Sequence, residues 1–230
     1  MLRHFLKDKK HIHGIMLVFQ AVQLLNTLVF SEMAFTVGVS EGPILGILLV
    51  SAIILHSTHV LFVSFYIPKK WLIPYGIILF GSFFYQGSLM SLPSSELINN
   101  SSLKLSFVLA NFIQTVQLII LFILVLTDSF RQHDSANYKF ISAANAFIMI
   151  PVTFGLIMFG LDVMLPIQLL AGDAAIASTW FNEAVQTSCY AIAGIDLPVD
   201  LHISLKNLAA IESIFSHLFM VLLVGRMIGK

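Results

Sequence analysis

The sequence predicts an all-α integral membrane protein with six transmembrane helices and a re-entrant pore helix and loop between spans five and six. Of its 230 residues, 58% are hydrophobic and 10% are charged, whereas soluble domains carry about 25% charged residues. The mean hydropathy is +0.93. Apolar stretches recur along the chain, and each is long enough for a bilayer crossing, which needs about 20 residues.

The composition also excludes several classes of function. The formal net charge is zero, so the chain has no electrostatic basis for binding nucleic acid. Its single cysteine, Cys189, cannot form an intramolecular disulfide. No phosphate-binding glycine loop and no spacing typical of a Ser-His-Asp triad is visible. We therefore expect no enzyme activity and no cofactor, and the lipid bilayer is the expected partner.

The chain begins with a basic segment, residues 1–13, which is expected to lie at a membrane surface. A first apolar span, residues 15–37, is followed by a short acidic turn at Glu41, Gly42 and Pro43. The remaining predicted spans cover residues 44–67, 71–92, 103–126, 140–165 and 203–227. Hydrophilic loops at 91–102 and 128–139 separate the third, fourth and fifth of these spans.

The distribution of basic residues supports this topology. Six spans place both termini on one side, and that side holds Arg3, Lys7, Lys9, Lys10, Lys69, Lys70, Arg131, Lys139, Arg226 and Lys230. Only Lys104 and Lys206 fall on the other side. Because Lys and Arg concentrate in cytoplasmic loops, we expect a multi-pass protein of the plasma (cell inner) membrane with both termini in the cytoplasm.

The segment between the fifth and sixth spans is too short and too polar to cross a bilayer. It combines a half-apolar helix that starts near Ser178 with a small-residue loop that holds Gly194, Asp196 and Pro198. Irregular backbone at membrane depth survives only where protein buries it or where it lines a water-filled cavity. The pattern therefore indicates a pore helix and loop that enter from outside, followed by a pore-lining helix.

At these residues the sequence resembles the two-helix pore module of the potassium-channel superfamily in its bacterial form. Residues 208–212 (Leu-Ala-Ala-Ile-Glu) and 218–229 follow the inner helix of that family, and Thr187 and Ser188 fall on a Thr-Thr pair of its pore helix. The resemblance covers about the last quarter of the chain. It implies a homotetrameric channel in which residues 140–230 form the pore domain and residues 1–139 form the basic lead and a peripheral four-helix bundle.

The selectivity filter of this family exposes rings of backbone carbonyls, which require two glycines that accept positive φ. In the aligned register the filter residues are Ala191, Ile192, Ala193, Gly194 and Ile195, followed by Asp196. Only one glycine is present, and Ala191 replaces the filter threonine. The resemblance therefore implies a channel for monovalent cations whose filter is wider or differently shaped, with weak discrimination between potassium and sodium.

Polar residues of the sixth span are candidates for pore lining or gating. A carboxylate such as Glu212 is costly inside a membrane and seldom faces lipid, and the resemblance implies a structural partner for it near the pore helix. Ser216 falls where the family often has a hinge glycine. His217 could line the cavity and respond to pH, although packing is the commoner role. The fourth span contains no arginine and only Lys104 at its start, so no voltage sensor is expected.

Two other interpretations stay open on the sequence. His56 and His59 lie three residues apart on one face of the second span, a spacing that could hold a metal or haem in a membrane-embedded redox protein. Hydrogen bonding within the fold is the commoner role of such a pair. In the other interpretation, the chain is a non-conducting oligomer that keeps the pore fold.

Overall fold

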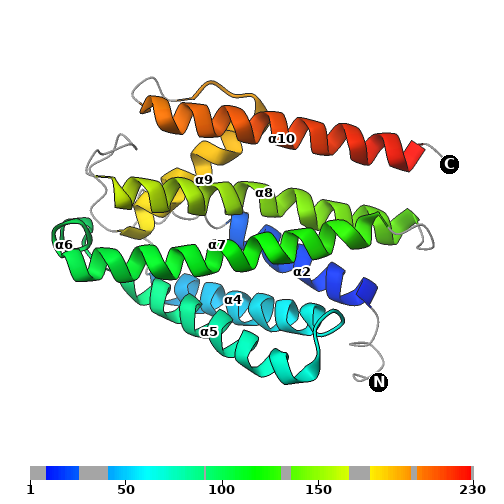
Figure 1. The fold of residues 1–230 in the computed structure, drawn as a ribbon, viewed down its shortest axis with the longest axis horizontal. Coiled ribbons are helices and arrows are strands. Elements are labelled where there is room, and N and C mark those ends of the chain that lie inside the picture. The colour runs from blue at the N-terminus through cyan, green and yellow to red at the C-terminus, as the bar shows by residue number, and fades with distance from the viewer. Residues whose placement is uncertain are drawn as a thin grey trace. The chain divides into compact units, whose positions relative to one another are not determined.

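The computed structural model describes residues 9–25, 41–90, 92–130, 136–165, 177–197 and 201–228. Within these ranges the chain is helical and contains no strand, which confirms the predicted all-α class. The helices are α2 (Lys9–Leu25), α4 (Glu41–Val63), α5 (Lys69–Met90), α6 (Ser94–Asn99), α7 (Ser101–Ser129), α8 (Ala136–Met164), α9 (Ala177–Ala193) and α10 (Ile203–Ile228) (Figure 1).

Four helical segments of the described chain are long and apolar enough to cross a membrane. They are Lys69–Leu89, Ser101–Ser129, Asn137–Met164 and Ile203–Leu223, and Val50–Val63 is a shorter apolar segment of α4. This agrees with a multi-pass membrane protein. Residues 26–37 of the predicted first span lie outside the described residues, and the six-span topology stays a prediction.

Several element ends differ from the prediction. The loop predicted at 91–102 contains α6, and Asn100 then starts α7, because its Oδ1 accepts hydrogen bonds from the backbone N–H groups of Ser102 and Leu103 at 3.1 and 3.2 Å. This is the role of a helix N-cap. The acidic turn expected at 41–43 is the first turn of α4, where Pro43 is tolerated because its missing N–H would have no partner in the helix.

The described chain divides into two compact units. Unit 1 comprises Met1–Gly81 and Leu118–Met149, and unit 2 comprises Ser82–Gln117 and Ile150–Lys230. In unit 1, α2 packs against α4, and Gln23 Nε2 donates a hydrogen bond to Ser51 Oγ at 2.5 Å. Polar side chains of this kind join apolar helices, because hydrocarbon offers them no alternative partner.

Unit 2 is built around an apolar core. The core consists of Leu89, Leu97, Phe107, Met158, Phe159, Val163, Ala184, Ala191, Leu201, Leu205 and Ala209. The rings of Phe107 on α7 and Phe159 on α8 meet edge to face with their centroids 5.0 Å apart, a favoured aromatic geometry. Because α9 and α10 both contribute to this core, their packing defines the region predicted to form a pore.

A polar network also crosses unit 2. Asn111 of α7 donates to the Leu156 carbonyl oxygen of α8 at 2.9 Å, and it accepts a hydrogen bond from Gln86 of α5 at 3.0 Å. Gly160 of α8 lies opposite Asn111, and a Cβ at Gly160 would stand 2.4 Å from Asn111 Nδ2. The glycine therefore makes room for the amide that joins α7 to α8.

Candidate functional site

Helix α9 packs closely against α8. A Cβ placed on Gly155 would lie 2.6 Å from Val185 Cγ2 and 2.9 Å from Val185 Cα, so the two backbones approach at a point that only glycine permits. One turn earlier on α9, Phe181 meets Phe159 of α8 with ring centroids 5.6 Å apart. The later residue of α9, Val185, thus contacts the earlier residue of α8, Gly155, so the two helices run antiparallel.

The C-terminal half of α9 also packs against α10. Ser188 Oγ donates a hydrogen bond to Glu212 Oε1, and both side chains have no exposed surface. Ala191 of α9 lies in the same buried core as Leu205 and Ala209 of α10. In Figure 1, α9 runs obliquely to α10 rather than as a third parallel helix.

The contacts that Val185 and Ser188 of α9 make lie well inside the two neighbouring helices. Gly155 lies nine residues before the C-terminus of α8 at Met164, and Glu212 lies nine residues after the N-terminus of α10 at Ile203. At 1.5 Å per residue, each contact is about 13 Å along its helix. Residues 194–202 then connect the end of α9 at Ala193 to the start of α10 at Ile203.

The end of α9 has a defined geometry. Gly194 has a φ of 68°, and the N–H of Ile195 donates to the Tyr190 carbonyl oxygen at 3.0 Å. This bond over six residues with a left-handed glycine is a Schellman motif, which stops a helix and satisfies one of its last carbonyls. The chain reverses here, and residues 193–196 are exposed.

The predicted filter residues do not share one conformation. Ala191, Ile192 and Ala193 form the last turn of α9, whereas Gly194, Ile195 and Asp196 follow it in irregular backbone. A carbonyl filter in this loop would therefore begin later than the aligned register implies, because helical carbonyls already point along the helix axis. Pro198 lies outside the described residues.

The two polar residues expected on the pore helix are turned inward. Thr187 Oγ1 donates to the Glu183 carbonyl oxygen at 2.8 Å, and Thr187 is 5% exposed. Ser188 makes the bond to Glu212 described above, so Glu212 has a hydrogen-bond partner on α9. The second carboxylate oxygen of Glu212, Oε2, has no hydrogen-bond partner among the described residues.

The other two residues predicted in the sixth span differ in their exposure. Ser216 is 1% exposed and donates to the Ser213 carbonyl oxygen at 2.9 Å. His217 is exposed, and its Nδ1 lies 2.6 Å from the same carbonyl oxygen. The exposed face that carries His217 is mainly apolar and includes Ile211, Ile214, Leu218, Val221 and Leu222. A single chain therefore leaves this face for lipid or for another subunit.

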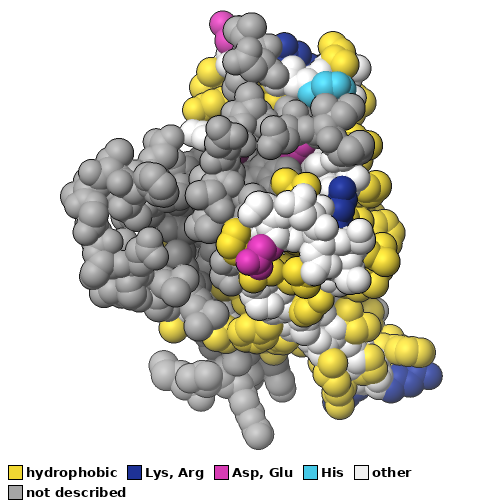
Figure 2. Space-filling model, turned by 90° about the vertical axis from the view of Figure 1, so that its left-hand side faces the viewer, with side chains coloured by type: hydrophobic (Ala, Val, Ile, Leu, Met, Phe, Trp, Pro, Cys, Tyr) yellow, Lys and Arg dark blue, Asp and Glu magenta, His cyan; other side chains and the backbone are white. Residues whose placement is uncertain are grey.

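Figure 2 looks onto the end of the molecule where α6 and the start of α7 lie, and uncharged polar and backbone atoms (white) gather in the middle of this view. The exposed polar residues of this segment are Ser95, Glu96, Asn99, Asn100, Ser101 and Ser102. Further along α7 the exposed residues become apolar, with Leu105 70% exposed and Phe112 63% exposed. This change fits a helix that passes from water into lipid.

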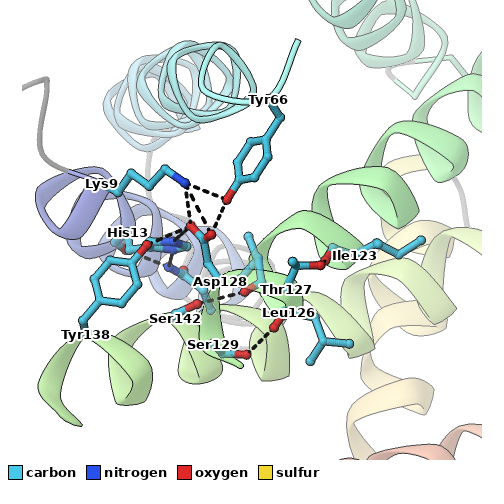
Figure 3. Close-up of polar contacts among 12 residues, drawn as sticks. Lys9, His13, Tyr66, Ile123, Leu126, Thr127, Asp128, Ser129, Tyr138 and Ser142 are labelled. Atoms are coloured by element: carbon cyan, nitrogen blue, oxygen red, sulfur yellow. Dashed lines mark hydrogen bonds and ion pairs between the residues drawn. The ribbon is translucent and has the colours of Figure 1, made fainter. Parts of the chain in front are cut away.

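Unit 1 contains a buried polar centre around Asp128, which no local sequence pattern indicates (Figure 3). Asp128 has no exposed side-chain surface. Its carboxylate accepts hydrogen bonds from the hydroxyl groups of Tyr66 and of Tyr138, the latter at 2.8 Å. Lys9 Nζ lies 3.4 Å from Asp128 Oδ1 and donates to Tyr66 at 3.0 Å. A buried charge needs such partners, because an unpaired one would be strongly destabilising.

The fourth partner of Asp128 is His13, whose Nε2 lies 3.4 Å from Asp128 Oδ2. Asn145 Nδ2 donates to the His13 carbonyl oxygen at 2.7 Å and also lies 3.3 Å from His13 Nδ1. Since Nδ2 is a donor, Nδ1 must accept, and the ring hydrogen is then on Nε2, facing the carboxylate. The centre therefore joins α2, α7, α8 and the turn after α4.

This centre corrects two predictions. Asp128 was expected in a hydrophilic loop at 128–139, but it belongs to α7. The hydroxyl groups that donate hydrogen bonds to its carboxylate take the place of water. Lys9 to His13 were expected in a surface lead, but they form the first turns of α2, where Ile12 and His13 have no exposed surface.

His56 and His59 lie one turn apart on α4, as expected, with ring centroids 5.7 Å apart. Among the residues that the structure describes, no group of three or more His, Cys, Asp or Glu side chains could hold a metal ion.

Comparisons with protein-family models, with curated proteins and with solved structures found no match to this chain.

Proposed function

We propose that the chain is the subunit of a homotetrameric, cation-conducting channel of potassium-channel-like architecture. In this proposal the chain has six spans, both termini are cytoplasmic, and α9 is a re-entrant pore helix between the outer helix α8 and the inner helix α10. The observation that carries the proposal is the pair of contacts that α9 makes with Gly155 and Glu212, each about 13 Å from the nearer end of its helix.

A segment that enters the membrane as a helix and returns to the same side as a loop fits these contacts. Helix α9 has 17 residues, and Val185 and Ser188 of α9 contact the interior of two apolar helices that are long enough to span a bilayer. The exposed loop that follows would then lie at membrane depth, and irregular backbone there needs protein or a water-filled cavity around it. Assembly of several copies around an axis at this loop would provide such a cavity.

The exposed face of α10 supports assembly as well. Its apolar side chains include Ile214, which is 62% exposed, and Val221, which is 69% exposed. In the tetramer this face is shared between lipid and neighbouring subunits, and His217 lies within it. Potassium-channel-like pores place the inner helices of four subunits next to the pore, so these residues would line the inner cavity.

Charge selection would come from the end of α9 and from the loop after it. The C-terminus of a helix carries a partial negative charge, which attracts cations. Asp196 is exposed three residues after the last residue of α9, and four copies would form a ring of carboxylates at the pore. A loop with one glycine offers fewer dehydrating carbonyl sites, so potassium and sodium would pass at similar rates.

The test is the conductance of the purified protein in planar bilayers, compared with that of Asp196→Asn. We expect cation-selective currents from the wild type and a reduced preference for cations over chloride in the variant. Glu96→Gln is a matched control, since Glu96 is also an exposed carboxylate but lies on α6. A well-folded tetramer that carries no current under potassium, sodium or chloride gradients would contradict the proposal and favour a non-conducting oligomer.

A further inference from the structure

His56 and His59 of α4 form a pair of neighbouring imidazole rings that has no part in the proposed channel. The rings of His56 and His59 are 5.7 Å apart, with their planes at 50°. His59 is 4% exposed, and its Nε2 has no hydrogen-bond partner among the residues that the structure describes. A buried polar atom without a partner costs free energy, and a ligand at this nitrogen would remove that cost.

The orientation of His56 suits ligation. Its Nδ1 lies 2.8 Å from the Ala52 carbonyl oxygen. A carbonyl oxygen can only accept, so Nδ1 carries the ring hydrogen and Nε2 carries the lone pair. Histidines that bind metals commonly donate their other ring nitrogen to a backbone carbonyl, which fixes the tautomer and the ring orientation. The Phe80 ring of α5, 6.0 Å from the His56 ring, makes the surroundings apolar.

We propose that His56 and His59 together bind one copper(I) ion. Imidazole nitrogens are good ligands for copper and zinc. Metal–nitrogen bonds of about 2 Å place two ligating nitrogens at most about 4 Å apart, which rings with centroids at 5.7 Å can meet. The spacing of the pair thus accommodates one ion between the two rings.

Copper(I) fits this pair better than zinc does. Zinc in proteins takes four ligands, and the described residues hold no cluster of three or more metal-ligating side chains. Copper(I) is satisfied by two neutral imidazoles in a linear arrangement. Its single positive charge is also less costly to bury in apolar surroundings than a double charge.

The test is a titration of the full-length protein in detergent with copper(I), under reducing conditions and against a competing chromogenic chelator. We expect one copper(I) per chain in the wild type. His56→Ala and His59→Phe should each lower the affinity at least about 10-fold, because loss of a ligand should cost no less than loss of an outer-shell partner. X-ray absorption of the loaded wild type should show two nitrogen ligands.

His217→Ala is the matched control. His217 Nδ1 also lies close to the carbonyl oxygen four residues earlier, at 2.6 Å from Ser213 O, but its side chain is exposed on another helix. This variant should bind copper(I) as the wild type does. The absorption measurement uses the unaltered chain, so it is decisive even if an α4 variant does not fold. Absence of binding, unchanged affinity in both α4 variants, more than two ligands or preference for zinc would overturn the proposal.

Discussion

The hydroxyl group of Ser188 on α9 donates a hydrogen bond to the carboxylate of Glu212 on α10, and neither side chain has any exposed surface. A carboxyl group inside an apolar helix is costly unless it has a partner. Here the partner is a hydroxyl group of the neighbouring helix α9. The pair therefore ties the position of α9 to the middle of the helix that we propose lines the pore.

Removing the hydroxyl group should destabilise the protein. Ser188→Ala leaves the Glu212 carboxylate without its donor, which should cost about 1–3 kcal/mol and lower the thermal unfolding temperature in detergent. Ser57→Ala is the control, because the Ser57 hydroxyl is exposed and donates only to a carbonyl of its own helix. Combining Ser188→Ala with Glu212→Leu should recover most of the loss, and a double variant less stable than Ser188→Ala alone would contradict this interpretation.

The close approach of α8 and α9 gives a second prediction. Gly155→Ala places a methyl group against the backbone of Val185, and we expect a loss of about 1–3 kcal/mol from overpacking. Gly81→Ala on α5 is the control, because nothing lies within 4 Å of a Cβ there. A helical glycine without such contacts should gain about 0.5–1 kcal/mol when replaced by alanine.

A double variant decides whether the clash at Gly155→Ala is with the backbone of Val185. Adding Val185→Ala to Gly155→Ala removes the contact with Cγ2 but not the contact with Cα at 2.9 Å. We therefore expect incomplete recovery of the unfolding temperature. Wild-type stability in Gly155→Ala alone would show that α9 does not pack this closely on α8.

The Asp128 centre predicts the effect of losing one phenolic hydroxyl group. Tyr138→Phe removes a hydrogen bond of 2.8 Å to a buried carboxylate, and bonds to charged groups contribute about 1.5–3 kcal/mol. The thermal unfolding temperature of Tyr138→Phe in detergent should therefore be lower than that of the wild type. Tyr85→Phe is the matched control, since Tyr85 is 44% exposed, and equal effects of the two changes would argue against the centre.

Much of the fold followed from the sequence, because apolar length and scarcity of charge are properties of each segment alone. The α4 to α10 helices were predicted within a few residues, apart from the short α6. Helix ends were less accurate, since they depend on single polar contacts such as the bonds to Asn100 Oδ1.

The polar centre and the close helix contact could not be predicted in the same way. Asp128 is separated from Lys9 by 119 residues and from Tyr66 by 62, so no local pattern links them, and a charged residue next to a loop is usually solvated. Gly155 looks like any glycine of an apolar helix until Val185 is placed against it. Glu212 was identifiable because a carboxylate in an apolar span is rare.

The proposed topology has its own test. In a Cys189→Ser background, cysteines introduced by Ile98→Cys on α6 and by Asp134→Cys, outside the described residues, should react with a membrane-impermeant reagent from opposite sides. The residue at 98 should react from outside, since the ten-to-two distribution of Lys and Arg predicts cytoplasmic termini. Labelling of both from the same side would rule out the six-span arrangement.

The central claim, a cation pore with weak discrimination between potassium and sodium, is tested most directly by the reversal potential of the purified protein in a planar bilayer. With potassium on one side and sodium on the other, we expect a reversal potential close to zero, because the loop after α9 keeps one glycine and few dehydrating carbonyls. Replacing part of the salt on one side should reveal preference for cations over chloride. A reversal potential near the potassium equilibrium value, or currents carried mainly by chloride, would contradict this claim.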